Sequence, residues 1–586
     1  MRKSIATVCL SGTLTEKLTA AARAGFDGVE IFENDLLASP LAPEEIAARA
    51  ADLGLTIDLY QPMRDVEAVP EDLFARTLRR ARHKFGLMRR LGVGTVLVCS
   101  NVSAPALDDD DLAADQLFRL AELAEESGIR VAYEALAWGR HVSTYDHAWR
   151  IVRTAGHPAL GTCLDSFHIL SRGSDPKGIE EIPGEKIFFL QLADAPLMAM
   201  DVLQWSRHYR CFPGQGGFDV TGLLHHVLAT GYTGPLSLEV FNDVFRQADA
   251  GRTALDGMRS LLALEESAGI SALPAPVVPT GVAFAELATS DPEPAEALLT
   301  AVGFTRTARH RTKPVDLWER GEARVVLTTA TRRTSTALAA LGLESPAPAA
   351  AARRAEALLA PTLPKHRTAD DVPLDSIAAP DGTEVLFCAT RRAGTASWTD
   401  DFTFTGESHA DGRLDHLALT QPWHHFDEAV LFHRAILGLR PHDTVELADP
   451  YGLFRSRALS ASPSGPRLVL NLAPTPGADD RARHIAVAVD DLVTTARACH
   501  AAGAPLLPVP GNYYDDLAAR FDLTEGELAT YRELGILYDR DEQGGEFLHC
   551  YTGTVGQVFF EFVQRKGGYS GYGAANAPIR LAAQRR

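Results

Sequence analysis

The chain has 586 residues, about twice the length at which a single hydrophobic core stops growing, so two or three domains are expected. Hydrophobic residues make up 46% and charged residues 23%, a globular composition that excludes general disorder. The net charge of −19 argues against nucleic acid or an anionic membrane as a partner, and no apolar run is long enough for a transmembrane helix. The seven cysteines lack CxxC spacing and form neither a disulfide framework nor a structural zinc site. A reduced, cytoplasmic enzyme is the expectation.

Strand and helix patterns alternate over the first 265 residues. Each of eight short apolar runs predicts a strand and is followed by a stretch with helical spacing. The runs are Ile5–Cys9, Gly28–Phe32, Thr56–Tyr60, Thr95–Val98, Arg130–Glu134, Leu160–Asp165, Ile187–Leu192 and Leu236–Val240. This count predicts an α/β fold, a (β/α)8 TIM barrel over residues 1–265. A doubly wound open sheet is the alternative, but Cys9–Leu14 lacks the Gly-rich first turn of that fold.

Oxygen-bearing side chains lie at the ends of four consecutive predicted strands. They are Glu134, Asp165, Gln191 and Glu239. Because the carboxyl ends of barrel strands meet at one rim, we expect these side chains to converge. Carboxylate and amide oxygens suit Mg²⁺, Mn²⁺ or Co²⁺, so the pattern predicts a metal site. The alternative is that each residue only caps the next helix.

Three other side chains near this rim are candidates for proton transfer and substrate binding. His168 follows Asp165 by three residues and could act as a general acid or base, or only support a metal ligand. Arg64 follows the third strand, and Arg210 lies in what reads as a basic loop. Either arginine could hold a carboxylate in fork geometry, the alternative being a solvated surface charge.

The second half has a different pattern. Residues 266–280 are rich in proline and small residues and are predicted to be a linker. Strand–helix–strand cycles begin at Gly281, Leu414 and Arg483. The repetition predicts internally duplicated βαβββ modules of α+β type, one over 281–400 and one over 411–586.

Two histidines and one carboxylate lie in separate predicted strands of this half. They are His416, His484 and Glu561. Such a set is the facial triad of non-haem iron sites and also binds other divalent ions. A lone strand histidine is more often a satisfied polar group, so the residues alone are weak evidence.

Several motifs of the first half resemble the xylose-isomerase-like barrel superfamily of sugar isomerases, epimerases and dehydratases. They are DGVEIFEND, VAYE, LDSFH, QLAD, RCFPGQG and SLEVF, and the resemblance covers residues 1–265. The superfamily often has histidine in the seventh strand, where this chain has Gln191, whose amide oxygen is also a plausible metal ligand.

The C-terminal segment resembles 4-hydroxyphenylpyruvate dioxygenase, of the vicinal-oxygen-chelate superfamily. The motifs are PGNYYDDLAARFDL, LGILYDRDEQGGEFLHCYT and VFFEFVQRKGGYSGYGAANAPIRLAAQ, within residues 411–584; a degenerate module at 281–395 lacks equivalent ligands. The resemblance implies that His416, His484 and Glu561 hold a second divalent cation. The dioxygenases usually have glutamine at the position of His549, so oxidation of hydroxyphenylpyruvate is not expected.

The combination of these two halves resembles the long bacterial form of the 3-dehydroshikimate dehydratases. That resemblance implies metal-dependent conversion of 3-dehydroshikimate to protocatechuate and water, as in quinate and shikimate catabolism. Alternatives are a sugar or keto-acid isomerase in the barrel, an iron-dependent dioxygenase in the C-terminal half, or a C-terminal half that is structural. The physiological metal and a homo-oligomeric state stay open.

Overall fold

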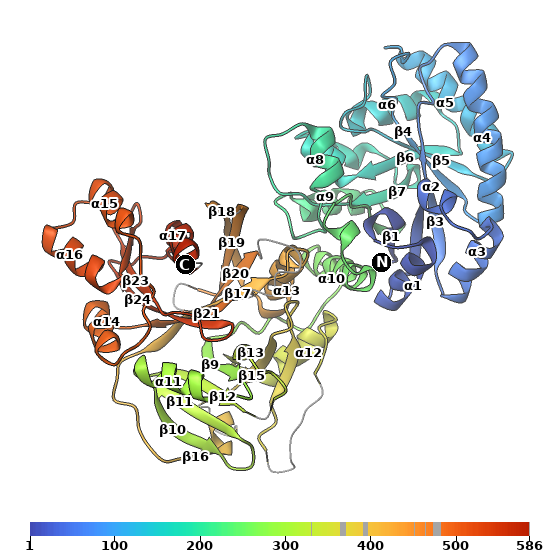
Figure 1. Ribbon diagram of the computed structural model, residues 1–586. Coiled ribbons are helices and arrows are strands. Elements are labelled where there is room, and N and C mark those ends of the chain that lie inside the picture. The colour runs from blue at the N-terminus through green and yellow to red at the C-terminus, as the bar shows by residue number, and fades with distance from the viewer. Residues whose placement is uncertain are drawn as a thin grey trace. The chain divides into compact units, whose positions relative to one another are not determined.

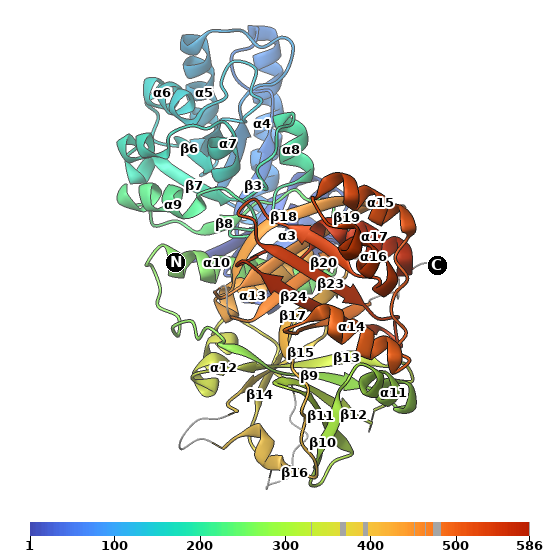
Figure 2. The same ribbon diagram turned by 90° about the vertical axis from the view of Figure 1, so that its left-hand side faces the viewer.

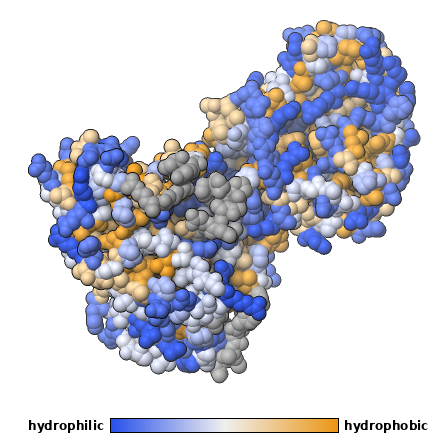
Figure 3. Space-filling view, viewed as in Figure 1, coloured by the Kyte–Doolittle hydropathy of each residue, from blue (hydrophilic) through white to orange (hydrophobic). Residues whose placement is uncertain are grey.

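The computed structural model describes residues 1–329, 331–363, 371–390, 396–449, 452–462, 465–472 and 482–584. The chain forms two compact units, Met1–Ala272 and Leu273–Arg586 (Figure 1). Hydrophilic side chains are spread over the visible face of both units, with apolar ones in smaller groups (Figure 3). Among the described residues, no helix is both long and apolar enough to cross a membrane.

The first unit is a closed barrel of eight parallel strands in sequence order. The strands are β1 (Lys3–Ala6), β2 (Gly28–Phe32), β3 (Thr56–Met63), β4 (Thr95–Cys99), β5 (Arg130–Glu134), β6 (Leu160–Asp165), β7 (Ile187–Leu192) and β8 (Leu236–Leu238). Leu59, Leu97, Ala132 and Phe189 pack in the barrel core. The predicted TIM barrel is confirmed, and its topology places the carboxyl ends of all strands at one rim.

Helices surround the barrel strands in both views (Figures 1 and 2). The longer ones are α1 (Leu14–Ala24), α3 (Pro43–Asp52), α4 (Glu71–Leu91), α5 (Asp110–Glu125), α6 (Tyr145–Ala155), α9 (Val220–Ala229) and α10 (Ala250–Ser267). The shorter ones are α2 (Glu33–Leu37), α7 (Ser166–Ser171), α8 (Val202–His208) and the 3₁₀ segments Thr7–Cys9, Pro176–Glu181, Gly184–Lys186 and Phe245–Gln247. Apolar faces of these helices cover the barrel, which explains their helical spacing in the sequence.

Several expectations about the barrel elements were wrong in detail. Strand β3 continues to Met63 rather than ending at Tyr60, and β4 ends at Cys99 rather than Val98. Strand β1 ends at Ala6, because the following residues turn into a 3₁₀ segment, and β8 ends at Leu238 rather than Val240. The basic segment before Arg210 is not a loop but the end of helix α8. Asp201 caps that helix by accepting hydrogen bonds from the N–H groups of Leu203 and Gln204, each 3.1 Å long.

The second unit contains two eight-stranded mixed sheets, which confirms the predicted α+β modules. The first has the order β14-β15-β13-β9-β12-β11-β10-β16. Its strands are β9 (Gly281–Ala288), β10 (Thr305–His310), β11 (Val315–Arg320), β12 (Ala323–Thr328), β13 (Ala337–Glu344), β14 (Asp375–Ala378), β15 (Glu384–Cys388) and β16 (Phe402–Phe404), with helices α11 (Glu293–Ala301) and α12 (Pro348–Ala357) and the 3₁₀ segment Trp398–Asp401.

The second sheet has the order β18-β19-β20-β17-β21-β24-β23-β22. Its strands are β17 (Arg413–Gln421), β18 (Arg440–Asp449), β19 (Gly452–Ser460), β20 (Arg467–Leu472), β21 (Arg483–Ala488), β22 (Leu537–Arg540), β23 (Glu546–Tyr551) and β24 (Val558–Lys566). Its helices are α13 (Phe426–Leu437), α14 (Leu492–Ala501), α15 (Gly511–Arg520), α16 (Glu525–Leu534) and α17 (Ala577–Gln584), with a 3₁₀ segment at Ala574–Asn576. The cation candidates lie on three adjacent strands of this sheet, β17, β21 and β24.

Candidate active site

A cavity of about 390 Å³ opens at the carboxyl ends of the barrel strands. Its lining includes Arg64, Glu134, Trp138, His168, Arg210 and Glu239. The barrel topology therefore brings together side chains that are more than 170 residues apart in the sequence, 239 − 64 = 175. The volume lies in the range of small-molecule sites.

Three buried carboxylates stand close together at this rim. Glu134, Asp165 and Glu239 are each at most 5% exposed. Burial and then neighbouring carboxylates raise the pKa of Glu134, and burial raises the pKa of Glu239 to about 7 despite the nearby charge of Arg210. The Oε1 atom of Glu134 is buried without a hydrogen-bond partner among the described residues. An unpaired buried oxygen in a cluster of like charges favours a bound cation.

Asp165 uses its two oxygens for different purposes. Its Oδ1 caps helix α7, accepting hydrogen bonds from the N–H groups of Phe167 (2.6 Å) and His168 (3.2 Å). Its Oδ2 accepts one of 2.8 Å from Arg210. Burial alone would raise the pKa of Asp165, but the charge of Arg210 lowers it below its ordinary value. Asp165 therefore caps helix α7 with Oδ1, as the alternative interpretation expected, and also directs Oδ2 toward the other charged residues of the site.

Arg210 is fully buried between these carboxylates. Its Nη1 lies 2.8 Å from Asp165 and 3.0 Å from Oε2 of Glu239, while Nε and Nη2 donate to Ser206. The guanidinium also lies over the ring of Phe167, 4.5 Å from its centroid. Most of its donors are therefore engaged by the protein, unlike those of Arg64, whose exposed guanidinium has no hydrogen bond or ion pair with the described residues.

His168 lies against Trp138, with ring centroids 5.1 Å apart. Its Nδ1 faces the N–H of Ala137 at 3.1 Å, and its Nε2 faces Nη2 of Arg210 at 3.2 Å. Both neighbours are donors, and a neutral imidazole has only one unprotonated nitrogen, so it accepts one of these bonds at a time. Burial lowers the pKa of His168 to about 3, the charges of Arg210 and Arg64 adding to the effect, so the ring is neutral at neutral pH.

The amide of Gln191 has a defined orientation. Its Nε2 donates a 2.6 Å hydrogen bond to Oε2 of Glu30 on β2, and its Oε1 faces Sγ of Cys163 at 3.4 Å. Glu30 also accepts a 2.7 Å bond from Gln61 and one from the hydroxyl of Ser237. Because the nitrogen end is held by Glu30, the oxygen end is the one left for a cation.

The side chains fit a divalent cation, although they are not equally close. Ligand atoms of Glu134, Asp165 and His168 lie within 4.8 Å of one another. Glu239 and Asp165 both accept a hydrogen bond from Nη1 of Arg210, which places Glu239 beside this group. Gln191 on β7 is the strand partner of Asp165 on β6. Three carboxylates face a single buried guanidinium, which leaves an excess of negative charge. Hard oxygen donors with such an excess suit Mg²⁺, Mn²⁺ or Co²⁺.

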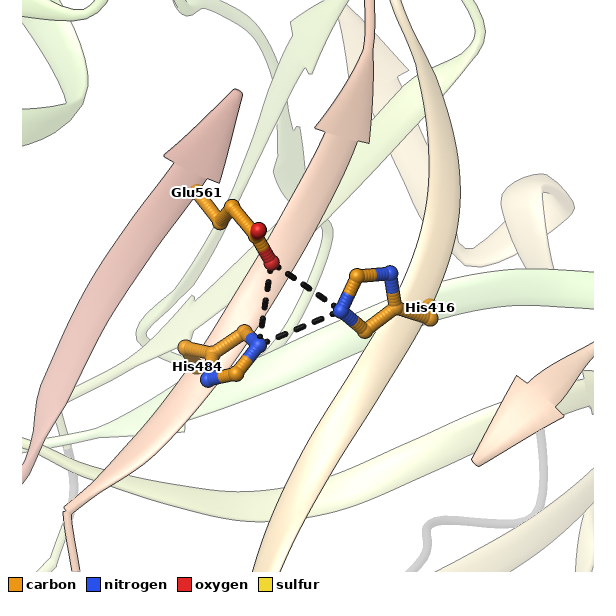
Figure 4. A group of neighbouring side chains, drawn as sticks. All are labelled: His416, His484 and Glu561. Atoms are coloured by element: carbon orange, nitrogen blue, oxygen red, sulfur yellow. Dashed lines mark hydrogen bonds and ion pairs between the residues drawn. The ribbon is translucent and has the colours of Figure 1, made fainter. Parts of the chain in front are cut away.

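The second sheet contains a separate cluster, which Figure 4 shows pointing toward a common point from three strands. Nε2 of His416 lies 3.0 Å, and Nε2 of His484 3.1 Å, from Oε2 of Glu561, and the two nitrogens are 3.2 Å apart. The register explains the convergence: His416 pairs with Ala486, which pairs with Glu561, and His484 lies two residues before Ala486. Ligands at right angles, about 2.1 Å from an ion, are about 3.0 Å apart, so the spacing suits one divalent cation.

Neighbouring side chains fix the orientation of this cluster. Nδ1 of His416 donates a 2.8 Å hydrogen bond to Asp415, which Arg565 holds with two further bonds of 2.8 Å. Nδ1 of His549 donates a 2.7 Å bond to Oε1 of Glu561 and leaves Oε2 for the cluster. Burial lowers the pKa of His484 to about 4, so its imidazole is neutral and able to bind a cation.

Comparison with known proteins identifies the family. The xylose isomerase-like TIM barrel family matches residues 18–264, and the N-terminal family of hydroxyphenylpyruvate dioxygenase matches residues 274–362. A 3-dehydroshikimate dehydratase of Pseudomonas putida is 45% identical over 100% of this chain and 98% of its own length, and one of Pseudomonas aeruginosa is 44% identical with the same coverage. The chain belongs to the 3-dehydroshikimate dehydratase family. A solved xylose isomerase-like TIM barrel/4-hydroxyphenylpyruvate dioxygenase fusion protein, 43% identical, covers 100% of this chain and 99% of that one with a TM-score of 0.91.

In this member of the dehydratase family, the structure adds site residues that the sequence analysis missed. Glu30 holds Gln191, Trp138 packs on His168, and Arg246 lines the same cavity as Arg64. Asp194 organises the loop that carries Arg210. Two of them gave a signal in the sequence: Glu30 is a charged residue inside the apolar strand GVEIF, and Asp194 ends the motif QLAD.

Proposed function

We propose that this chain is a metal-dependent 3-dehydroshikimate dehydratase that forms protocatechuate and water in the barrel cavity. The observation that carries the proposal is the cluster of three buried carboxylates at the strand ends around one buried guanidinium, that of Arg210. Among the described residues, Oε1 of Glu134 has no hydrogen-bond partner. Full-length relatives with the same name agree with it. Glu134, Asp165, Gln191 and Glu239 would hold Mg²⁺, Mn²⁺ or Co²⁺.

The reaction removes a proton next to the substrate ketone and then the hydroxyl group one carbon further, which together make one water molecule. A bound divalent cation would supply stabilisation of the negative charge that develops on the ketone oxygen. His168 is the proposed proton-transfer residue, because it is neutral and lies on the cavity wall. Its unprotonated nitrogen would exchange its bond from Ala137 or Arg210 for the substrate proton. When the ring is protonated, it can return this proton to the departing hydroxide.

Arg64 and Arg210 are proposed to position the substrate in different ways. Arg64 is exposed at the cavity, so its fork of donors can bind the substrate carboxylate. Arg210 lines the cavity as well, but its contacts with Asp165, Glu239 and Ser206 occupy most of its donors. It would orient the carboxylates and His168 around the substrate and contribute the weaker of the two carboxylate contacts.

Variants at His168 and Arg64 test these roles. His168→Ala should keep the bound metal and lose about 100- to 10,000-fold in turnover, the usual contribution of acid–base catalysis. Arg64→Ala should mainly raise KM for 3-dehydroshikimate. A folded His168→Ala variant with near-normal turnover would reduce His168 to a supporting residue.

The cluster of His416, His484 and Glu561 is proposed to hold a second divalent cation without oxidising hydroxyphenylpyruvate. His549 occupies the position at which the dioxygenases usually have glutamine, and here it donates a hydrogen bond to Glu561. Oxygen uptake by iron-loaded protein with an aryl pyruvate should therefore be absent. Uptake that disappears in His484→Ala would instead make the chain bifunctional.

A further inference from the structure

The first sheet of the second unit has a cavity of about 600 Å³ that the dehydratase reaction does not use. Alternate residues of three strands line one face of the sheet there: Phe284 and Glu286 on β9, Val326 and Thr328 on β12, and Glu384 and Leu386 on β15. Successive residues of a strand point to opposite faces of a sheet, so residues two apart point to the same face. The three pairs therefore line one face together. The volume suits a small organic molecule.

One wall of this cavity is aromatic. The Trp398 ring lies 4.6 Å from that of Phe284 and 5.8 Å from that of Phe402, measured between centroids. Nε1 of Trp398 donates a 2.8 Å hydrogen bond to Thr390, which fixes the indole. Phe284 lies against Gly342 of β13, where a Cβ atom would come within 2.5 Å of the phenyl ring. Because Gly342 has no side chain, the Phe284 ring can pack directly against β13 at this position.

Two carboxylates in the cavity, those of Glu286 and Glu384, form no ion pair with any described residue. Glu286 accepts a 2.7 Å hydrogen bond from Thr328 on Oε1, and among the described residues its Oε2 has no partner. Glu384 lines the same cavity and makes no ion pair with any described residue. Burial and then the charge of Glu384 raise the pKa of Glu286, and these effects outweigh the hydrogen bond from Thr328 and the more weakly acting charge of Lys313.

The other acidic residues of the lining already have partners. Asp371 pairs with Lys313 at 2.9 Å, and Asp401 pairs with Arg311 at 3.1 Å and accepts from the N–H of Val372. These two aspartates lie close enough to His310 to suggest a metal cluster. The paired ammonium and guanidinium groups argue against that interpretation, because a metal ion would have to displace both cations. Among the described residues of the lining, Glu286 and Glu384 are the carboxylates without an ion pair.

We propose that this cavity binds an organic cation, a primary ammonium or amidinium group carried on an aromatic or apolar body. The charged group would lie between Glu286 and Glu384, and the body would pack on Phe284, Trp398 and Phe402. Cations on carboxylates gain charge-assisted hydrogen bonds, and aromatic faces attract both the cation and the apolar body. The site is independent of the barrel cavity and of the cluster around His416, since it shares no residue with either.

The test uses the full-length protein and 2-phenylethylamine as the probe, with binding measured by calorimetry at neutral pH. The neutral 2-phenylethanol and the anionic 3-phenylpropionate are probes of the same aromatic body without the positive charge. A small ligand of this size is expected to bind with a dissociation constant of about 1 mM. The neutral and the anionic probe should each bind at least about tenfold more weakly than 2-phenylethylamine, a difference typical of one charge-assisted hydrogen bond.

Variants locate the binding. Glu286→Gln combined with Glu384→Gln should lower the affinity for 2-phenylethylamine at least about tenfold. Glu356→Gln, on the exposed face of α12, is the matched control and should bind like the unmodified chain. Thermal unfolding shows whether each variant is folded, and Thr328→Val gives a second, milder change at Glu286. No saturable binding at about 10 mM amine, tighter binding of 3-phenylpropionate, or equal affinity in the folded double variant would each overturn the proposal.

Discussion

The orientation of one amide decides whether Gln191 can replace the histidine that related barrels often have. Glu30 holds the nitrogen end of that amide at 2.6 Å, from a position 161 residues away in the sequence. The sequence motif QLAD predicts an oxygen at the rim, but it contains nothing that distinguishes the two ends of the amide. That distinction depends on a partner brought near only by closure of the barrel, which is why it could not be predicted.

Glu30→Gln tests this positioning. The new amide has one oxygen to accept the bonds from Gln191, Gln61 and Ser237, so the Gln191 amide should lose its fixed orientation. We expect the affinity of the barrel for Mn²⁺ to fall about 10- to 100-fold, the usual effect of losing a group that orients a metal ligand. Chelator competition in a Glu561→Gln background would isolate the barrel site. Glu122→Gln, exposed on α5, is the control, and an unchanged affinity in Glu30→Gln would refute the role of Glu30.

Asp415 should have the same kind of effect on the second cluster. It fixes Nδ1 of His416 at 2.8 Å and is itself held by Arg565. Asp415→Asn should weaken divalent cation binding there about 10- to 100-fold, measured in a Glu134→Gln background. The exposed Asp443→Asn on β18 serves as the control. Equal affinity in both variants would contradict the importance of this bond.

The same residue gives a pH prediction. Burial would raise the pKa of Asp415, but the hydrogen bonds from Arg565 and His416 hold it well below its ordinary value. A carboxylate with a lowered folded-state pKa stabilises the protein above its unfolded pKa, about 3.9, and this contribution is lost as pH falls. The difference in free energy of unfolding between the original chain and Asp415→Asn should therefore shrink below about pH 4. A difference independent of pH in denaturant titrations would contradict this.

At the scale of elements, the loop between β7 and β8 places Arg210 in the cavity, and Asp194 organises that loop. Its two oxygens accept hydrogen bonds of 2.8–3.0 Å from the N–H groups of Ala195, Gly214, Gly216 and Phe218. Its main chain also pairs with Cys211, directly after Arg210. At Gly216 a Cβ atom would lie 2.3 Å from Oδ1 of Asp194, so this close approach requires glycine.

Asp194→Ala should therefore leave four N–H groups without their acceptor and displace Arg210. We expect a loss of about 2–4 kcal/mol in the free energy of unfolding, together with a fall in kcat. Asp201→Ala removes only the cap of α8 in the same loop and should cost about 1 kcal/mol. Denaturant unfolding of both variants gives the comparison. Equal losses would show that the contacts of Asp194 contribute no more than an ordinary helix cap.

The elements of the barrel show which features a sequence pattern can predict. The ranges of β2, β5, β6 and β7 agree with their apolar runs, because a buried parallel strand needs continuous apolar residues. The segment Arg207–Arg210 was predicted to be a loop, although its first two residues end helix α8, because the start of that helix depends on the capping bonds of Asp201. In the second sheet, His416, His484 and Glu561 were predicted together through a family resemblance, while their geometry follows from strand register, which the sequence does not reveal.

At the scale of the whole molecule, each of the two units contains its own cluster of side chains that could hold a divalent cation. Every residue assigned to the dehydration lies within Met1–Ala272, and the cluster around His416 lies within Leu273–Arg586. The mechanism therefore makes the barrel the site of the chemistry. The composition and charge of the chain, by contrast, excluded classes of partner but contained no information about which unit is catalytic.

Formation of protocatechuate from 3-dehydroshikimate tests this account most directly. The full-length chain would be stripped with a chelator and resupplied with Mg²⁺, Mn²⁺ or Co²⁺, alongside Glu134→Gln and the matched Glu561→Gln. We predict that the stripped chain is inactive, that added cation restores the product in the unmodified chain and in Glu561→Gln, and that folded Glu134→Gln stays at least about 100-fold slower. Full activity of the stripped chain, or normal activity in Glu134→Gln with loss in Glu561→Gln, would contradict the account.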